Sequence, residues 1–247
     1  MCCFTRPVES VTDTRIFARE SRAMMQFLVY EMKFSAAEDL AMILPIPVPR
    51  RTNEKAVRFI NLEMYPTFFS AMESGFPPPG RGATGGMGGG GFGGSKLRVV
   101  DVGSFEASFV PTVDDFSRLD ERFRLPSGTW DQLPQYKTYG FAVFKLKKGD
   151  GKIHPMAFEF PRADRTRLFF PTVHIHDGQV HDEADFDHRL YAQFGARHEI
   201  GSLDWKESRQ PADMFLDISR CEGLVAKKFH VYKQAINGKH KNEDILA

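Results

Sequence analysis

Apolar residues along this chain fall in short runs whose length is typical of β-strands. Residues 25–34, MQFLVYEMKF, carry apolar side chains on both faces of the predicted strand. Residues 139–146, YGFAVFKL, and residues 153–160, IHPMAFEF, flank the turn sequence KKGDGK, so they predict a β-hairpin. A further strand over residues 167–176 leads into a group of histidines. This pattern predicts a sheet in which antiparallel pairing dominates.

Two other segments predict extended structure of a less regular kind. Residues 41–49, AMILPIPVP, alternate apolar residues with Pro45, Pro47 and Pro49. Because proline has no backbone N–H to donate to a ladder, we expect an edge strand or an extended wall segment here. Residues 97–111, LRVVDVGSFEASFVP, predict a strand or a bent hairpin.

Helical spacing occurs in two places. Residues 55–72 predict a helix that Pro66 interrupts and that resumes for a short turn. Residues 114–125, DDFSRLDERFRL, predict an amphipathic helix. Its buried face would consist of Phe116, Leu119 and Phe123. The charged C-terminal residues 237–247 predict a frayed tail.

Residues 76–95 are low in complexity and rich in glycine. They lack the G-K-[ST] ending of a phosphate-binding loop and no apolar strand precedes them, so we interpret them as a disordered surface insertion. The sheet segments on its two sides need each other's strands to form a core. We therefore predict a single α+β domain over residues 1–247, with predominantly antiparallel sheet and a few short helices.

Composition excludes several classes of partner. A net charge of +1 provides no long-range field to attract nucleic acid or an anionic membrane. The apolar runs are too short to span a bilayer, and no apolar signal region follows Met1, so we expect a cytoplasmic protein. Three cysteines do not make a disulfide framework and are expected to be reduced. Nothing in the composition indicates an oligomeric state.

The chemically richest stretch is FPTVHIHDGQVHDEADFDH, residues 170–188, which holds half of the eight histidines. They are His174, His176, His181 and His188. Strand alternation places the first two on one face, about 7 Å apart at the α-carbon. Imidazole together with carboxylate suits Zn²⁺ and other divalent transition metals. The stretch therefore predicts a metal centre, with zinc as the expected ion and these four histidines as ligands.

Such a centre implies a hydrolytic reaction. A zinc site with three protein ligands and one open position lowers the pKa of its bound water to about 7. Asp177, Asp182 or Glu183 would serve as general base or would orient the ligands by hydrogen bonds. The sequence HIHDGQVH approaches the H-x-H-x-D-H signature of metallo-hydrolases but does not match it. We predict a metal-dependent hydrolase whose small-molecule substrate the sequence does not identify.

The segment that follows Asp182 has two interpretations. In a helix, His181, Asp185 and His188 would share a face, which favours the metal centre. In a strand, His188 would instead share a face with its neighbours two residues away, Phe186 and Leu190.

Cys2 offers an alternative function. Removal of Met1 would place a thiol and a free α-amine on one residue, as in N-terminal-nucleophile amide hydrolases. The strand Ile16-Phe17-Ala18-Arg19 is similar to one in those enzymes, but Glu20 and Ser21 stand where their aspartate is expected. Cys2 and the histidines would form one site if the N-terminus lay near Val173. A third possibility is a non-catalytic metal-binding or scaffold protein.

Several segments together resemble a known family. They include Pro7-Val8, RIFAR, the run LVYEMKFSAAEDLAMILPIPVP, YPTF at residues 65–68, VGSFEASFVP, and YGFAVFKLKKG followed by IHPMAFEFP. Their order over roughly residues 2–170 is similar to the uncharacterised bacterial family called domain of unknown function 2330. The chain departs from it in lacking an export signal and in its glycine-rich and histidine-rich stretches. No activity is attached to that family, so the resemblance implies no site residue.

Overall fold

The computed structural model describes residues 2–77, 100–103, 105–125, 128–152, 154–175, 179–195 and 205–247. Two large sheets dominate it. The eight-stranded sheet runs in the order β14 (Lys206–Glu207), β15 (Tyr232–Lys241), β13 (Glu183–Gln193), β2 (Ser10–Arg22), β3 (Met25–Ala36), β10 (Met156–Pro161) and β5 (Arg58–Asn61), with β9 (Gly149–Lys152) paired to β3. Strand β13 pairs with β2 in parallel, and the other pairs in this sheet are antiparallel.

The second sheet has six strands, in the order β12 (His174–Ile175), β1 (Cys2–Phe4), β4 (Leu40–Ile46), β8 (Gly140–Leu146), β7 (Phe105–Val110) and β6 (Val100–Val102). A small third sheet pairs β11 (Phe169–Phe170) with β16 (Ile245–Leu246). The helical elements are α1 (Phe68–Ser74) and the 3₁₀ segments η1 (Asp114–Arg118), η2 (Glu121–Phe123), η3 (Thr129–Gln132), η4 (Pro134–Tyr136), η5 (Ala212–Met214) and η6 (Ile218–Arg220). Predominantly antiparallel sheet with a few short helical elements thus makes up the structure, as predicted.

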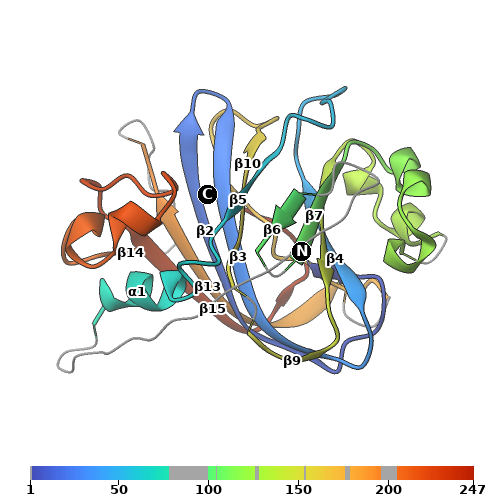
Figure 1. The fold of residues 1–247 in the computed structure, drawn as a ribbon, viewed down its shortest axis with the longest axis horizontal. Helices are drawn as coiled ribbons and strands as arrows, with labels where there is room; N and C mark the ends of the chain where they lie inside the picture. The colour runs from blue at the N-terminus through green and yellow to red at the C-terminus, as the bar shows by residue number, and fades with distance from the viewer. Residues whose placement is uncertain are drawn as a thin grey trace.

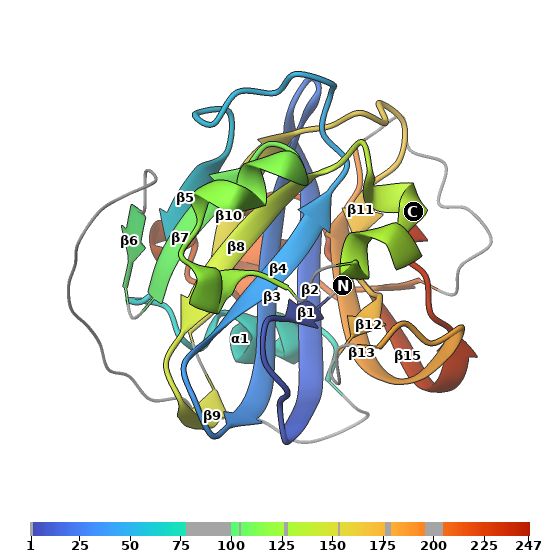
Figure 2. The same cartoon turned by 90° about the vertical axis from the view of Figure 1, so that its right-hand side faces the viewer.

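The elements form four layers, which Figure 1 shows from one side to the other. Helix α1 and the segment around β14 cover the outer face of the eight-stranded sheet, and the six-stranded sheet covers its inner face. In Figure 2 the 3₁₀ segments between β7 and β8 lie over β4 and β8 of the six-stranded sheet. The central strands of both sheets, such as β3 and β4, are therefore covered on both faces.

Three apolar clusters fill the spaces between these layers, and strand β3 shows how alternation assigns residues to them. Leu28 and Tyr30 belong to the core between the two sheets. Phe27 and Val29 point the opposite way and pack with the residues of α1. This division explains why residues 25–34 are apolar on both faces, since a strand covered on both faces has no solvent side.

The chain crosses between the sheets where a hairpin was expected. Strand β8 pairs with β4 and β7 in the six-stranded sheet, whereas β10 pairs with β3 and β5 in the other. The turn sequence between them forms β9, which pairs with the end of β3. The predicted hairpin of residues 139–146 with 153–160 is therefore wrong. Local turn signals show where a strand ends but not which partner the next strand finds.

The proline-containing segment is also placed differently from the expectation. Strand β4 is not an edge strand, because β8 pairs along its whole length and β1 pairs on its other side. The β1 pairing reaches only Met42 and Ile43. Pro45 lies past the end of that pairing, so its missing N–H removes no bond to β1.

Helix prediction succeeded in part. Residues 68–74 form α1 after Pro66, as expected, but residues 58–61 form strand β5, which pairs with β10. Residues 114–125 form two 3₁₀ segments instead of one amphipathic helix. The three apolar residues of that segment are nevertheless buried against the six-stranded sheet: Phe116, Leu119 and Phe123.

The C-terminal residues are ordered by their contacts with other segments. Residues 237–241 complete β15, and β16 pairs with β11, so the expectation of a frayed tail is wrong. Asp244 accepts hydrogen bonds from the backbone of Thr172 at 2.9 Å and from the hydroxyl of Tyr136 at 2.7 Å. The predicted glycine-rich insertion lies almost wholly outside the described residues.

Candidate functional site

The N-terminal strand lies directly beside the first histidine of the cluster. Strand β1 pairs in parallel with β12, so that Cys2 is opposite His174 and Cys3 is opposite Ile175. The other side of β1 pairs with β4, and Cys3 is fully buried. The main chain at Cys2 therefore lies beside the main chain at His174, close to Val173. The side chain of Cys2 lies outside the described part of the chain.

Two of the four histidines belong to an aromatic cluster. The ring centroids of His174 and His188 lie 4.8 Å apart, and Phe186 lies 4.8 Å from the first ring and 5.0 Å from the second. His240 packs edge-on against Phe186 at 5.7 Å. The side chain of His188 is buried, with a residue exposure of 1%. His188 therefore packs against Phe186 as a core side chain, whereas His174 is partly buried and His240 is exposed.

Strand formation after Asp182 decides which residues accompany His188. Residues Glu183–Gln193 form β13, so Phe186 and His188 share a face and Asp185 points the opposite way. The helical alternative, which would have joined His181, Asp185 and His188, is wrong. Strand β13 lies between β2 and β15, and that pairing overrides any local helical preference.

Of the remaining predicted site residues, the structure describes the side chains of His181 and Asp182. His181 and Asp182 are exposed in the turn before β13, and His176 and Asp177 lie outside the described residues. Asn242, which sequence reasoning missed, holds this turn. Its amide donates to the carbonyls of His174 and His181, each at 2.9 Å, and its Oδ1 accepts from the N–H of His174 at 2.7 Å.

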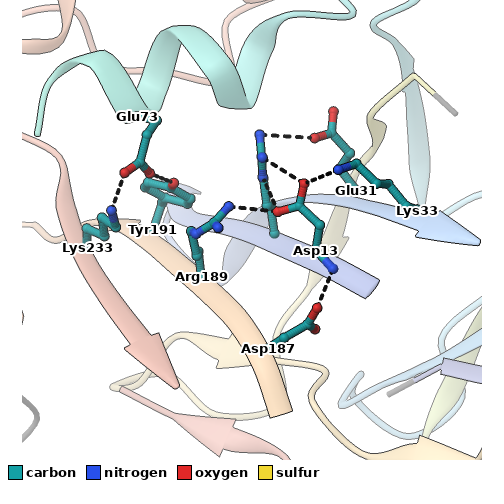
Figure 3. A network of polar contacts seen from close by, with 9 residues as sticks. Asp13, Glu31, Lys33, Glu73, Asp187, Arg189, Tyr191 and Lys233 are labelled. Carbon is teal, nitrogen blue, oxygen red and sulfur yellow. Dashed lines mark hydrogen bonds and ion pairs between the residues drawn. The ribbon is translucent and has the colours of Figure 1, made fainter. Parts of the chain in front are cut away.

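A second group of charged residues surrounds Asp13 on β2 (Figure 3). Its carboxylate accepts from Arg15 Nε at 3.0 Å and Nη2 at 2.8 Å, and from Arg189 Nη1 at 2.7 Å. Lys33 Nζ lies 3.2 Å from the same carboxylate, and the Asp13 N–H donates to Asp187. We call these five residues the Asp13 cluster.

Backbone geometry explains why an aspartate occupies this position. Asp13 has a φ of 55° and lies where the register between β2 and β3 shifts. Aspartate tolerates this left-handed conformation better than most residues, and bulges of this kind re-aim side chains. Here the bulge turns the carboxylate toward cations from β2, β3 and β13.

The negative charge of Asp13 is paired with positive charges inside the cluster. Burial alone would raise the pKa of Asp13, but hydrogen bonding and the positive charges of Arg15, Lys33 and Arg189 outweigh it and hold that pKa below its usual value. Burial acts to lower the pKa of Arg15, yet Asp13 and the buried Glu31 raise it overall. The cluster is a structural joint between three strands and shows no chemistry of its own.

Glu73 fixes helix α1 to the eight-stranded sheet (Figure 3). Its carboxylate accepts from the hydroxyl of Tyr191 on β13 and from Nζ of Lys233 on β15. Burial, with Glu73 beside it, raises the pKa of Tyr191, so this hydroxyl stays a donor at neutral pH. The C-terminal end of α1 is thereby held on two neighbouring strands.

Comparison with known proteins identifies the fold. No family model matches the chain, and no curated protein sequence matches it. The crystal structure of baculovirus P35 is similar over 96% of each chain, with 15% identity and a TM-score of 0.50. A crystal structure of a mutated baculovirus P35 after caspase cleavage is similar over 95% of this chain and 98% of that one, with 14% identity and a TM-score of 0.52. The chain therefore shares this fold along almost its whole length.

These findings correct the predicted function. Within the described residues, no group of three or more His, Cys, Asp or Glu side chains is arranged to hold a metal ion. The neighbouring fold is that of P35 and not that of a zinc hydrolase. The prediction of a metal-binding hydrolase is wrong, because two of its histidines are aromatic-cluster residues and the other described one, His181, lies in an exposed turn. The resemblance to domain of unknown function 2330 stays a prediction.

In the described ranges no helix has both the length and the apolar character needed to cross a bilayer.

Proposed function

We propose that this chain is a protein inhibitor of a cysteine protease of the caspase kind. The observation that supports this proposal is that almost the whole chain has the fold of P35, a mutated form of which has been crystallised after caspase cleavage. P35 is thus a protein on which a caspase acts. On this proposal the partner of the chain is a folded protease and not a small-molecule substrate.

The layered core supports this role. A protein that engages a protease must remain folded while the protease acts, and only exposed segments are cleaved readily. The central strands of both sheets are covered on both faces, and α1 is held to the sheet by Glu73. Proteolysis of an exposed turn would leave these layers in place.

The distribution of aspartates decides where a caspase can cut, because these proteases cleave after aspartate. Residues 78–99 contain neither aspartate nor glutamate. Exposed aspartates occur in the turn between β3 and β4, at Asp39, between η1 and η2, at Asp120, and in the turn before β13, at Asp182. These are the described positions at which we expect cleavage to be found first.

The test is a titration of active caspases with the purified chain. Initiator and effector caspases of known active-site concentration are incubated with increasing amounts of the protein, and residual activity is measured with a fluorogenic peptide. We expect activity against at least one caspase to reach zero near one equivalent, with a stable complex on gel filtration. Mass spectrometry of the mixture then locates any cleaved bond.

Two controls separate inhibition from other outcomes. An ordinary competing substrate is turned over, so caspase activity recovers as the chain is consumed, and the heat-unfolded chain reproduces that behaviour. An Asp→Glu variant at any cleaved position keeps the charge but is one methylene longer, which a pocket selective for aspartate disfavours. Full activity of every caspase at micromolar chain, with no complex formed, would contradict the proposal.

A further inference from the structure

A pocket of about 350 Å³ opens where the ends of β2, β10 and β13 meet. Its wall includes Glu20 from β2, Arg162 and Arg165 from the segment after β10, and Phe194 after β13. Leu168 completes an apolar part of the lining. The volume is at the lower end of the range found for small-molecule sites, which is about 300–1,000 Å³.

Arg162 gives the pocket a buried positive charge. The residue is only 4% exposed, and Nη2 donates to Glu20 Oε1 at 2.9 Å. Two long hydrogen bonds reach backbone carbonyls, from Nη1 to Arg167 at 3.3 Å and from Nη2 to Arg165 at 3.4 Å. The buried Nε has no acceptor among the residues that the structure describes. A buried donor without an acceptor is costly, so added negative charge beside this guanidinium is favourable.

The charges that line the pocket do not cancel. Arg162 and Arg165 carry two positive charges, and Glu20, whose side chain is 45% exposed, carries one negative charge. Arg165 is exposed and can reach a ligand without leaving a buried partner. The pocket therefore favours a ligand with one negative group.

The apolar lining limits the shape of that ligand. Leu168 is 3% exposed and Phe194 is 8% exposed, and Phe194 is held in place by Trp205 at 5.3 Å and Tyr232 at 5.4 Å between ring centroids. A Cβ added to Gly195 would lie 3.9 Å from Glu20 Oε2, so there is ordinary contact space on that side. The site thus offers a fixed apolar wall next to the positive charge.

We propose that this pocket binds a small carboxylate that carries a short apolar body. Arg165 contacts the carboxylate, the buried Arg162 adds a second positive charge, and Leu168 and Phe194 contact the apolar body. The inference is separate from the proposed protease inhibition, since it depends on a different set of residues and on a ligand of different size.

The test is calorimetric titration of the full chain with isovalerate, in parallel with isovaleramide, which has the same body without the charge. We expect isovalerate to bind with a dissociation constant of about one millimolar, as the few contacts of so small a ligand allow. Isovaleramide should bind at least tenfold more weakly. Acetyl-leucine has the same branched body and carries the carboxylate of a peptide C-terminus. If it binds more tightly than isovalerate, the pocket is assigned to the C-terminus of a peptide. If it binds more weakly, the pocket is assigned to a small free carboxylic acid.

Two arginine variants test whether isovalerate binds in this pocket. Arg165→Gln should weaken isovalerate about tenfold, which corresponds to loss of one charge-assisted contact. Arg167→Gln is the matched control, because Arg167 is exposed, pairs with Asp164 and does not line the pocket. It should bind isovalerate as the parent does.

Three results would overturn the inference. Equal affinity for isovalerate and isovaleramide would show that the negative charge of the ligand does not contribute to binding. Equal weakening by both variants would show that binding is diffuse. Binding of inorganic phosphate but not of isovalerate, with the same loss in Arg165→Gln, would make the pocket a simple anion site without the apolar part.

Discussion

Substitution of Asp13 by asparagine tests the reasoning about the charged joint between β2, β3 and β13. Asparagine keeps the shape of the side chain and tolerates the φ of 55°, so the backbone is not strained. The change removes the negative charge that two guanidinium groups and one ammonium group share. Asp13→Asn therefore isolates the electrostatic contribution from the conformational one.

The size of the expected stability loss follows from the solvent exposure of the side chains around Asp13. The side chains of Asp13 and Arg15 are each 16% exposed, so their contact is largely removed from water, and a hydrogen bond to a charged group contributes about 1.5–3 kcal/mol. The Arg189 and Lys33 side chains are 40% and 56% exposed, so they add little. Arg15 keeps Glu31 at 3.7 Å after the substitution. We expect a loss of about 2 kcal/mol in the free energy of unfolding.

Urea denaturation followed by fluorescence measures this loss. If the free energy of unfolding falls by about 2–3 kcal/mol per molar urea, the urea concentration at the midpoint of unfolding should fall by about 0.7–1 M. Asp115→Asn is the control, since Asp115 pairs with Arg118 on an exposed surface and should change stability by no more than about 0.5 kcal/mol. Asp13→Ala should cost about 1 kcal/mol more than Asp13→Asn, because alanine is strained at this φ.

The dependence on pH provides an independent check. The folded pKa of Asp13 lies below 3.8, so its stabilisation is fully present above that value and is lost as the pH falls through the folded pKa. The difference between parent and Asp13→Asn should therefore shrink in strong acid. A difference below about 0.5 kcal/mol at pH 7, or one that is unchanged in acid, would refute the reasoning.

Three further predictions concern other contacts. In Gly103→Ala, the new Cβ would lie 2.5 Å from His154 Nε2 at a φ of 64°, so we expect a loss of about 2–3 kcal/mol in urea denaturation. Burial lowers the pKa of His154, so stability should fall as the pH drops below about 6.5, and His154→Leu should flatten that slope; an unchanged slope would assign it to another group. In Glu73→Gln, hydrogen exchange should accelerate at Phe69 and Met72 in α1 and stay unchanged in β3, and uniform acceleration would contradict the anchoring role.

Sequence reasoning located the candidate site only in part. It singled out Cys2 and His174, which strand pairing does bring opposite each other. It missed Asn242 and Arg162, whose neighbours in sequence carry no motif. The contacts of these two residues reach His174 and Glu20, which are distant along the chain, and no local pattern encodes such contacts.

The sequence by itself determined which residues are buried and where most strands run. Apolar positions on both faces predicted that β3 is covered on both sides, and helical spacing identified Phe116 as a core residue although the segment is 3₁₀. These properties follow from the periodicity of side chains along a single element, which is local.

Only the tertiary structure decided which elements meet. It placed β8 and β10 in different sheets, made residues 58–61 a strand beside β10, and turned His188 toward Phe186 instead of toward a metal. Strand pairing joins residues far apart in sequence, and the free energy of that pairing and of the layers that cover it outweighs local preference. In its local sequence His188 is a plausible metal ligand. In the folded chain, where β13 pairs with β2 and β15, it is a core residue.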